Sequence, residues 1–526
     1  MALHLKRDRP GIAAFMDLGT NSVRLLIVRI EANHAYRILA EHREMVRLGE
    51  GEFIEQRLQP KAMHRAALIC GKFAHLARTR GAQEIIAVAT AAVREADNKN
   101  AFLRRLRQET GLEVRVVSEM EEARLVYLGV SSGIHLGEKT ALFIDIGGGS
   151  TEIAVGDQRQ HHFLASLRLG AIRVTSLYLP DPAAPVPAEL YALIQRNVRV
   201  VALRTIQQVR RYHLDLAVGS SGTIQNLAVI ASRMTDPRKG DRAGVLRHDQ
   251  LKRVIKALCE LPLEKRRRLP GINPERADII IGGAAVLDTL MQELQISEIS
   301  VSERGLRDGL LMDYLSRRQP DYWPMSVRMR SVLQLGRTCG FDEAHAQNVA
   351  ALALELFDSA GAAGLHAWGA AEREWLHYAA LLHDVGAFLS YNRHHAHGHY
   401  LISNADLLGF DLTEVAIIAA AALFHRKAFA GPKRPEYAAL DRHSQKIVRT
   451  LSVLLRLAES LNRGHTNVVR HAGLRVARGR KIILTVQAAG DCQFEIWGVL
   501  GNQASFEKEF GRALTIEQTG DRPKTP

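Results

Sequence analysis

Two short segments of the chain repeat one pattern of residue types. The first reads FMDLGTNS (15–22) and the second FIDIGGGS (143–150), each with an Asp that follows an apolar run. Small, flexible residues come after each Asp, and a second apolar run begins beyond them. The pattern predicts a strand, a tight turn and a returning strand, with a turn backbone that a ligand can approach closely. Two such turns facing one another would bind phosphate and a divalent cation, whereas the alternative is two ordinary hairpins.

The second copy contains three consecutive glycines and continues through Ser150 and Thr151 to Glu152. Such a run is costly to order, so it indicates close approach of a ligand to the backbone rather than a linker. No lysine follows at Walker-A spacing, which disfavours a P-loop. Asp145 and Glu152 stand at the two ends of the turn, and their hard oxygen atoms suit Mg²⁺ or Mn²⁺.

Three further segments carry groups of the same chemistry. Arg94 ends the segment ATAAVR (89–94), and its guanidinium suits paired hydrogen bonds to phosphate oxygens. Glu121 and Glu122 stand at a predicted strand-to-helix junction, where acidic residues also occur simply as helix starts. The segment GSSGT (219–223) follows another apolar run and offers N–H and hydroxyl donors for phosphate or a nucleotide.

The elements that must position these residues alternate between short β-rich runs and helical stretches up to about residue 312. The β-rich runs are 84–89, 113–117, 141–146, 214–218 and 298–301. This alternation predicts an α/β architecture, and the repeat predicts two similar lobes with a boundary near residues 130–140. The region from about 325 to 468 has apolar residues at helical spacing and reads as all-α. Alternating runs at 472–476, 481–486 and 492–499 predict a small β-containing domain at the end.

The composition and the apolar runs indicate the class of protein and its cellular location. The 526 residues exceed what one core supports, and 47% apolar with 24% charged residues is typical of a soluble globular protein. The longest apolar run, Val415–Phe424, is too short to cross a bilayer, and the charged segment Met1–Pro10 leads into no signal core, so we expect a cytoplasmic protein. The four scattered cysteines lack metal or redox spacing.

A formal charge of +14 favours a polyanionic partner, either nucleic acid or a long phosphate chain. Basic runs such as 265–268 fit that partner, although such runs are commonly plain solvated surface.

Eight motifs in one order carry a resemblance to a known family. They are DLGTNS (17–22), ATAAVREADN (89–98), EEARLVYLGV (121–130), DIGGGSTE (145–152), SLRLGAIR (166–173), GSSGTI (219–224), PERADIIIGGA (274–284) and VSERGLRDGLL (301–311). Together they resemble the exopolyphosphatase/guanosine pentaphosphate phosphatase family of the actin-like superfamily, over about residues 12–312. The resemblance implies two actin-like (ribonuclease H-like) lobes, at residues 1–135 and 136–315. It also implies a partner that is inorganic polyphosphate or guanosine pentaphosphate, with no need for nucleic acid.

The resemblance assigns roles to single residues. Glu122, the second acid of the EEAR motif, is the implied catalytic residue, and Asp145 and Glu152 are the implied ligands of Mg²⁺ or Mn²⁺. The predicted phosphate-binding set is Asp17, Gly19, Asn21, Ser22, Arg94, Gly147, Gly148, Gly149, Ser150, Thr151, Gly219, Ser220, Ser221, Gly222 and Thr223.

The implied reaction is removal of the terminal phosphate of polyphosphate by metal-assisted, in-line attack of water, in a homodimer. The close alternative is removal of the 5′ γ-phosphate of guanosine pentaphosphate. Two other classes of function stay open from sequence, an ATP-binding kinase-like protein and a sensor without catalysis.

The helical region has a constellation of its own. His345 and the pair His383-Asp384 resemble the HD phosphohydrolase fold, which we expect at residues 320–468, before a small β-rich domain at 469–526. An HD metal site needs a late Asp, and Glu459 stands at the matching place. His345, His383, Asp384 and Glu459 therefore form a possible second metal site. The alternative is a relic domain whose histidines, including those at 394 and 425, pack helices or bind a phosphate chain.

Overall fold

The computed structural model describes residues 11–31, 35–236, 244–318, 325–405, 407–426, 430–477 and 481–518. These residues form two compact units, of which the first comprises nearly all of the chain up to Val327 and the second begins at Arg328. The charged segment at positions 1–10 and the predicted start of the helical domain at 320–324 lie outside the described residues.

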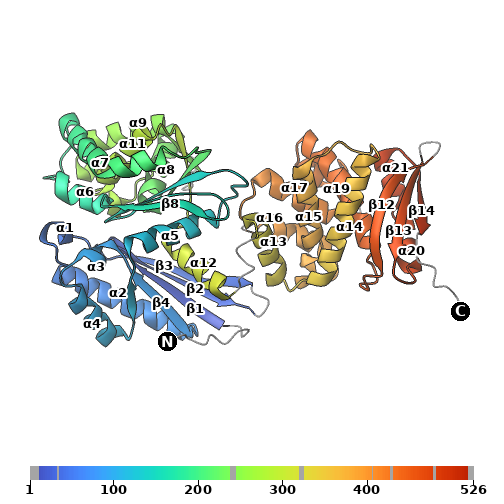
Figure 1. Cartoon of the computed structure of the whole chain (residues 1–526), viewed down its shortest axis with the longest axis horizontal. Coiled ribbons are helices and arrows are strands. Elements are labelled where there is room, and N and C mark those ends of the chain that lie inside the picture. The colour runs from blue at the N-terminus through green and yellow to red at the C-terminus, as the bar shows by residue number, and fades with distance from the viewer. Residues whose placement is uncertain are drawn as a thin grey trace. The chain divides into compact units, whose positions relative to one another are not determined.

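The first lobe is built on a five-stranded sheet of order β3-β2-β1-β4-β5 (Figure 1). Strands β1 to β3 run antiparallel to one another, while β4 and β5 extend the sheet in parallel with β1. Helices α2 and α4 bury apolar side chains such as Phe73 and Phe102 against one face of the sheet. The strands are β1 (Gly11–Leu18), β2 (Ser22–Ile30), β3 (Tyr36–Met45), β4 (Glu84–Ala89) and β5 (Val114–Val116), and the helices are α1 (Glu52–Glu55), α2 (Pro60–Thr79), α3 (Ala91–Glu95) and α4 (Lys99–Thr110).

The second lobe repeats this topology on a six-stranded sheet of order β10-β11-β9-β6-β7-β8. Strands β6 to β8 form the antiparallel part, and β9 lies parallel to β6 as β4 does to β1. The strands are β6 (Ala141–Ile146), β7 (Thr151–Gly156), β8 (His161–Leu167), β9 (Leu216–Ser220), β10 (Val245–Arg247) and β11 (Glu298–Val301). The longer helices of this lobe are α6 (Ala171–Tyr178), α7 (Ala188–Val209), α8 (Ser221–Thr235), α9 (His248–Glu260) and α11 (Ile280–Glu293).

Helices α5 (Glu119–Ser131) and α12 (Leu306–Arg318) lie between the two sheets (Figure 1). One apolar core joins both helices to the inner faces of both sheets, for example through Phe15 and Phe143. The helices cross with almost no space between their backbones, because a methyl group on Gly309 would overlap the carbonyl of Leu125. The close contact with α12 therefore fixes the position of α5, and with it the position of the first turn of α5.

The second unit contains a helical domain followed by a three-stranded sheet. The helices of the domain are α13 (Val327–Thr338), α14 (Glu343–Ala362), α15 (Ala370–Leu382), α16 (His394–Ser403), α17 (Leu412–Leu423), α18 (Pro435–Ala438) and α19 (Arg442–Ser460), with the short helix η3 (Val385–Phe388). The sheet has the order β12-β13-β14, with β12 (Val469–Val476), β13 (Ile482–Ala488) and β14 (Leu514–Gln518), and it is accompanied by α20 (Gln493–Leu500) and α21 (Gln503–Phe510). No helix in these ranges is long and apolar enough to cross a membrane.

The predicted strand at 492–499 is wrong, because this segment forms helix α20. Its buried side chains, Cys492, Glu495 and Val499, recur every three or four residues, and a helix buries all three on one side. A short apolar run fits both periodicities, so the sequence pattern did not distinguish them. The third strand of this sheet is instead β14.

One residue of the basic run at 265–268 does not belong to the surface, whereas Lys265, Arg267 and Arg268 are exposed. Arg266 is fully buried in the second lobe. Its guanidinium donates five hydrogen bonds of 3.0–3.2 Å to backbone carbonyls, among them those of Pro182, Leu258 and Ala277. This arginine therefore holds three loop segments together and is not available to a polyanion.

Candidate active site

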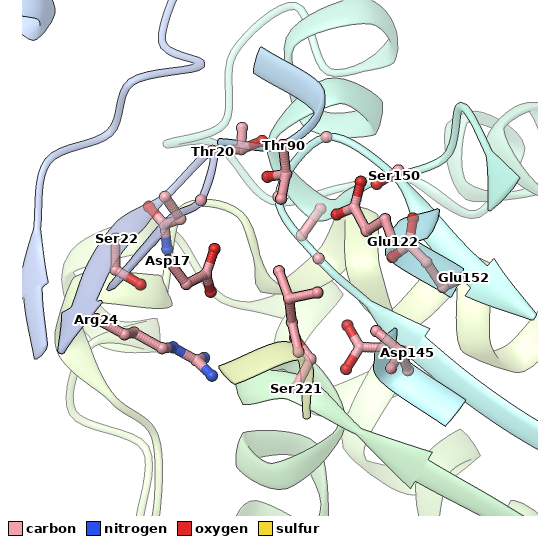
Figure 2. A pocket seen from close by; sticks show the side chains of 18 of the residues that line it. Asp17, Thr20, Ser22, Arg24, Thr90, Glu122, Asp145, Ser150, Glu152 and Ser221 are labelled. Carbon is pink, nitrogen blue, oxygen red and sulfur yellow. The ribbon is translucent and has the colours of Figure 1, made fainter. Parts of the chain in front are cut away.

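A cleft opens between the two lobes of the first unit, where both repeated turns meet the first turn of α5 (Figure 2). Asp17 and Arg24 enter it from one side, and Glu122, Asp145 and Glu152 from the other. The lining residues are Asp17, Gly19, Thr20, Asn21, Ser22, Arg24, Thr90, Glu122, Val126, Asp145, Gly147, Gly148, Gly149, Ser150, Glu152, Ala171, Ser221, Arg276, Ile279 and Leu306.

The two turns share one hydrogen-bonding pattern. The N–H of Gly19 donates to the carbonyl of Ser22 over 3.1 Å, and the N–H of Gly147 donates to the carbonyl of Ser150 over 3.0 Å. Each turn thus closes a hairpin with two residues at its tip. The repeat in the sequence is a repeat in structure.

The backbone of the second turn is oriented by helix α6. The carbonyls of glycines 147–149 accept hydrogen bonds of 2.7–3.1 Å from the start of α6, where Arg173 donates through both its backbone and its side chain. Because a trans peptide holds its C=O and N–H on opposite sides, the N–H groups of Gly148, Gly149 and Ser150 point away from α6. Successive N–H groups presented in this way form a site for an anion.

The first turn is held in the same manner by a different segment. The carbonyl of Thr20 accepts from the N–H of Gly49 over 2.9 Å, and the carbonyl of Asn21 accepts from Val46 and Arg47 over 3.0 and 2.9 Å. The N–H groups of the following residues are therefore turned away from the loop at 46–49. In both turns, neighbouring segments donate hydrogen bonds to the carbonyl groups, and the N–H groups face the opposite side, where a ligand can accept from them.

The tips of the two turns touch one another directly. A Cβ atom on Gly148 would stand 2.9 Å from the Cβ of Thr20, and one on Gly149 would stand 2.9 Å from the Thr20 hydroxyl oxygen. No side chain fits at either position without displacing the facing turn. The glycine run therefore serves the contact between the lobes as well as access for a ligand.

Charge distinguishes the two turns. In the first hairpin the cross-strand partner of Asp17 is Arg24, whereas in the second the partner of Asp145 is Glu152. Arg24 and Glu152 occupy equivalent positions of the repeat, and all four side chains line the cleft. One turn is balanced in charge and the other carries two carboxylates.

Sequence reasoning missed the two arginines of the cleft, Arg24 and Arg276. Arg276 ends the short helix η1 (Pro274–Arg276) and is buried. Burial, together with the nearby Arg43 and Arg24, lowers the pKa of Arg276 to about 9, so neighbouring positive charges face one another without full compensation. The sequence repeat could have indicated Arg24, because Arg24 aligns with the predicted metal ligand Glu152. Arg276 lies within the PERAD motif, but nothing local links it to the turns.

The acidic side chains of the cleft hold protons more tightly than they would in water. Burial raises the pKa of Glu122 to about 7, although Arg94 opposes the shift, and it raises the pKa of Asp17 to about 6, although Arg24 opposes it. Burial also raises the pKa of Asp145 and, with the charges of Glu122 and Asp145, that of Glu152. Four buried carboxylates thus gather where a bound cation would offset their charge.

The structure places Arg94 behind the catalytic candidate rather than on the surface of the cleft. Its Nη1 donates to Oε2 of Glu122 over 2.7 Å and to the carbonyl of Val117 over 3.2 Å. Its Nε and Nη2 atoms are buried without a hydrogen-bond partner in the described part of the chain. Arg94 therefore orients Glu122, and its remaining donor atoms are buried behind that carboxylate rather than presented to the cleft.

Several residues of the predicted phosphate-binding set point elsewhere. The hydroxyl of Thr151 donates to the carbonyl of Leu169, and Ser220 donates to Asp145. Within 219–223 only Ser221, whose φ is 74°, lines the cleft. The others have packing roles that local sequence does not show: Gly219 lies against Ile224 and Ile299, Gly222 against the Arg276 guanidinium, and Thr223 against Gly283.

The cleft fits the predicted metal. Asp145 and Glu152 face it with hard oxygen donors, and Oδ1 of Asp17 and Oδ1 of Asn21 are buried without hydrogen-bond partners among the described residues. Oxygen atoms of this kind are the ligands that Mg²⁺ and Mn²⁺ prefer. Asp145 and Glu152 remain the residues that we expect to hold the ion.

In the second unit, the predicted ligands His345, His383 and Asp384 do come together. Glu459 belongs to no group of three potential ligands among the described residues. Instead, Asp384 forms a second such group with His394 and His425. The sequence contained these histidines but gave no indication of which of them share the site.

The chain matches the Ppx/GppA phosphatase family over residues 26–318, which is more than half of its length. The chain belongs to the Ppx/GppA phosphatase family. Residues 327–489 match domain III of Ppx/GppA phosphatases, so the helical domain is a regular part of this family's architecture.

Individual Ppx/GppA relatives agree with this assignment. The guanosine-5′-triphosphate,3′-diphosphate pyrophosphatase of Vibrio vulnificus (strain YJ016) is 28% identical over 488 residues, which cover 90% of this chain and 92% of that protein. A Ppx/GppA family member from Aquifex aeolicus is 27% identical with a TM-score of 0.50 and covers 59% of this chain and 99% of its own. An exopolyphosphatase from Cytophaga hutchinsonii, 23% identical, shares the fold with a TM-score of 0.55 over 58% of this chain and 98% of its own. The two lobes therefore have the actin-like fold of Ppx/GppA phosphatases.

Proposed function

We propose that this Ppx/GppA protein is an exopolyphosphatase, which removes the terminal phosphate of inorganic polyphosphate by in-line attack of water. The observation that carries the proposal is the pair of facing turns, whose N–H groups and arginines suit a phosphate group and whose carboxylates suit a cation and a water. The formal charge of +14 supports a long polyanion as the substrate.

In this proposal the terminal phosphoryl group lies between the two turns. The N–H groups of the turn tips bind its oxygen atoms, and Arg24 and Arg276 balance its charge. Glu122 orients the attacking water and accepts its proton, a role that suits a carboxylate whose pKa is raised to about 7. Arg94, hydrogen-bonded to Oε2 of Glu122, keeps the other oxygen of that carboxylate directed at the water.

Asp145 and Glu152 would hold the ion. When bound there, Mg²⁺ or Mn²⁺ would supply the positive charge that offsets the buried carboxylates and the charge developing on the transferred group. Ser220 and Ser166 each donate a hydrogen bond to one of these two carboxylates and thereby fix its orientation.

Removal of the 5′ γ-phosphate of guanosine pentaphosphate is the second candidate. The observation in its favour is the Vibrio vulnificus relative, whose name states an activity on guanosine-5′-triphosphate,3′-diphosphate and which aligns over 90% of this chain. The same turns would bind the terminal phosphate of either substrate.

The deciding experiment measures phosphate released from long-chain polyphosphate, guanosine pentaphosphate and ATP, each with Mg²⁺. A higher kcat/KM with polyphosphate is the expected result, and a higher value with guanosine pentaphosphate selects the second candidate. Phosphate transfer from ATP to another acceptor, or binding of polyphosphate without hydrolysis, would contradict both. Light scattering on the same preparation tests the homodimer that we propose.

A further inference from the structure

Arg173 joins the two lobes of the first unit beside the cleft, although it does not line the cleft itself. It lies in the first turn of α6, on the second lobe, and its side chain is 10% exposed. Its Nε donates to the carbonyl of Gly149 over 2.7 Å, and its Nη2 donates to Oε1 of Glu95 over 2.7 Å. Gly149 belongs to the second turn, whereas Glu95 ends α3 on the first lobe. One guanidinium therefore connects the second turn to the opposite lobe.

Glu95 follows directly after the residue that orients the catalytic candidate. Arg94 and Glu95 are the last two residues of the short helix α3, and Arg94 donates to Oε2 of Glu122 over 2.7 Å. Their side chains reach different elements, since Arg94 binds α5 and Glu95 binds α6. Bonds between charged groups at this distance are strong, and such a supporting layer keeps reacting groups in place. The position of the second turn relative to Glu122 is therefore set through α3.

The guanidinium of Arg173 lies flat against an aromatic ring of the first lobe. Its Cζ atom is 4.0 Å from the centroid of the Phe53 ring, and Phe53 belongs to α1, which packs against α6 (Figure 1). The same ring supports the second turn, because a Cβ atom on Gly149 would stand 2.9 Å from Cζ of Phe53. Stacking on the ring and hydrogen bonds in two directions fix the orientation of a planar group. A lysine ammonium lacks this planar fork, so it cannot make all three contacts at once.

A second carboxylate near Arg173 does not compete with Glu95 at neutral pH. Glu52 is buried, and its Oε2 has no hydrogen-bond partner among the described residues. Burial raises the pKa of Glu52 to about 8, although the charge of Arg173 opposes the shift, and the charge of Glu95 adds to it. Glu52 is therefore mostly protonated at pH 7, which leaves Arg173 to pair with Glu95.

We propose that Arg173 and Glu95 are positioning residues, which hold the second turn where the bound phosphate is in line with the water on Glu122. This inference rests on the role proposed above for Glu122. Arg173 acts on the phosphate side through the Gly149 carbonyl, and Glu95 acts on the water side through its neighbour Arg94. Phosphoryl transfer depends mainly on such alignment, and a displacement of about 1 Å can lower the rate about 100-fold.

The test compares kcat and KM of full-chain variants, with Mg²⁺ and whichever of the two proposed substrates the wild type hydrolyses faster. Glu95→Ala removes the link between the lobes but keeps the bond from Arg173 to the turn. Its kcat should therefore fall about 10- to 30-fold, while KM changes less than about 2-fold. Arg173→Lys also loses the bond to the Gly149 carbonyl, so KM should rise about 3- to 10-fold in addition. Glu95→Gln should stay within about 3-fold of wild type, because its amide oxygen still accepts from Nη2.

A double-variant cycle separates positioning from a general loosening of the cleft. In the Glu122→Gln background, Glu95→Ala should lower kcat by no more than about 3-fold, because no carboxylate remains with which the phosphate must align. A purely structural defect would lower kcat by the same factor in both backgrounds. Equal factors in the two backgrounds, or wild-type kcat in Glu95→Ala, would overturn the inference.

Glu293→Ala is the matched control for the loss of an ion pair. Glu293 accepts from Arg199 over 2.7 Å within the second lobe, and neither residue lines the cleft. This variant should keep the kcat and KM of wild type. Thermal unfolding shows that each variant is folded, and if Glu95→Ala is not, Arg173→Lys takes its place in the cycle.

The experiment also separates this inference from the proposed function. If Glu122→Gln lowers kcat and Glu95→Ala does not, the positioning role fails and the role of Glu122 stands. If Glu122→Gln itself keeps the kcat of wild type, the role of Glu122 fails, and the positioning role fails with it.

Discussion

The two hairpin turns of the first unit have the same backbone and different charges. Each is closed by an N–H···O=C bond of 3.0–3.1 Å and has its carbonyls tied to a neighbouring segment. The first turn pairs Asp17 with Arg24 across the strands, and the second pairs Asp145 with Glu152. The shared backbone offers N–H groups for an anion at both turns, and the single exchanged residue decides which turn also suits a cation. We therefore expect variants of the two turns to fail in different ways.

The largest effect is expected at Glu122, which belongs to neither turn and has no counterpart in the repeat. Glu122→Gln should lower kcat for phosphate release by at least about 100-fold while KM changes little, because the lost carboxylate acts on water and not on the bound phosphate. Steady-state kinetics with polyphosphate measures both constants. Glu121→Gln is the control, since Glu121 pairs with Arg124 outside the cleft. Turnover close to wild type in Glu122→Gln would contradict the role assigned to this carboxylate.

Substitutions at the exchanged position test the comparison itself. Arg24→Gln should raise KM about 10- to 100-fold at constant Mg²⁺, because it removes a charged partner of the phosphate. Glu152→Gln should instead raise the Mg²⁺ concentration needed for half-maximal activity by a similar factor. Titrations of substrate at fixed metal, and of metal at fixed substrate, separate the two effects. If both variants changed the same constant, it would be wrong to assign phosphate binding to Arg24 and metal binding to Glu152.

A smaller effect is expected where the turns touch. In Gly148→Ala the added methyl meets the Thr20 side chain, so the facing turns must separate by a few tenths of an ångström. A cost of about 1.4 kcal/mol, which lies within the range for such overpacking, would lower kcat/KM about 10-fold if the displaced turns no longer bind the transferred phosphate in place. Gly244→Ala provides the control, because a methyl there meets open space without a left-handed φ. Equal kcat/KM in the two variants would show that the contact between the turns does not matter for activity.

The last effect concerns the stability of the protein without its ligands, and not its activity. Burial raises the pKa of Asp17 to about 6 from an ordinary value of 3.8, so ionisation opposes folding as pH rises through this window. Without substrate and metal, Asp17→Asn should therefore raise the free energy of unfolding by about 3 kcal/mol at pH 8, and the gain should vanish below about pH 3. Urea unfolding at both pH values measures it. A variant that is less stable than wild type at pH 8 would show that the Asp17 carboxylate is compensated in the folded state.

Local sequence predicted much of this molecule because its elements carry local patterns. The strands at 84–89, 141–146 and 298–301 have the predicted bounds, because each is a short β-rich run with polar or flexible residues beyond it. The edge strand β3 is more polar and exposed and was not predicted, and the 492–499 segment fitted two periodicities at once. The pattern of apolar residues therefore predicts buried strands better than exposed edge strands, and it does not separate a short helix from a strand.

The sequence predicted those residues of the candidate site that belong to one of the local motifs. The turns, Glu122 and Asp145 all line the cleft. The placement of Arg94 against Glu122, the entry of Arg276 and the choice of His394 and His425 over Glu459 depend on contacts between segments far apart in the chain. Such contacts leave no trace in the spacing of residues along one sequence.

The buried Arg266 has a consequence for how the second lobe folds. Its five hydrogen bonds collect carbonyls from segments around positions 182, 260 and 277, which lie up to about 95 residues apart in the chain. A guanidinium that is only partly bonded is costly to remove from water, so a structure with one or two of these segments in place gains little. We therefore expect the three segments to become ordered together, in a single cooperative step.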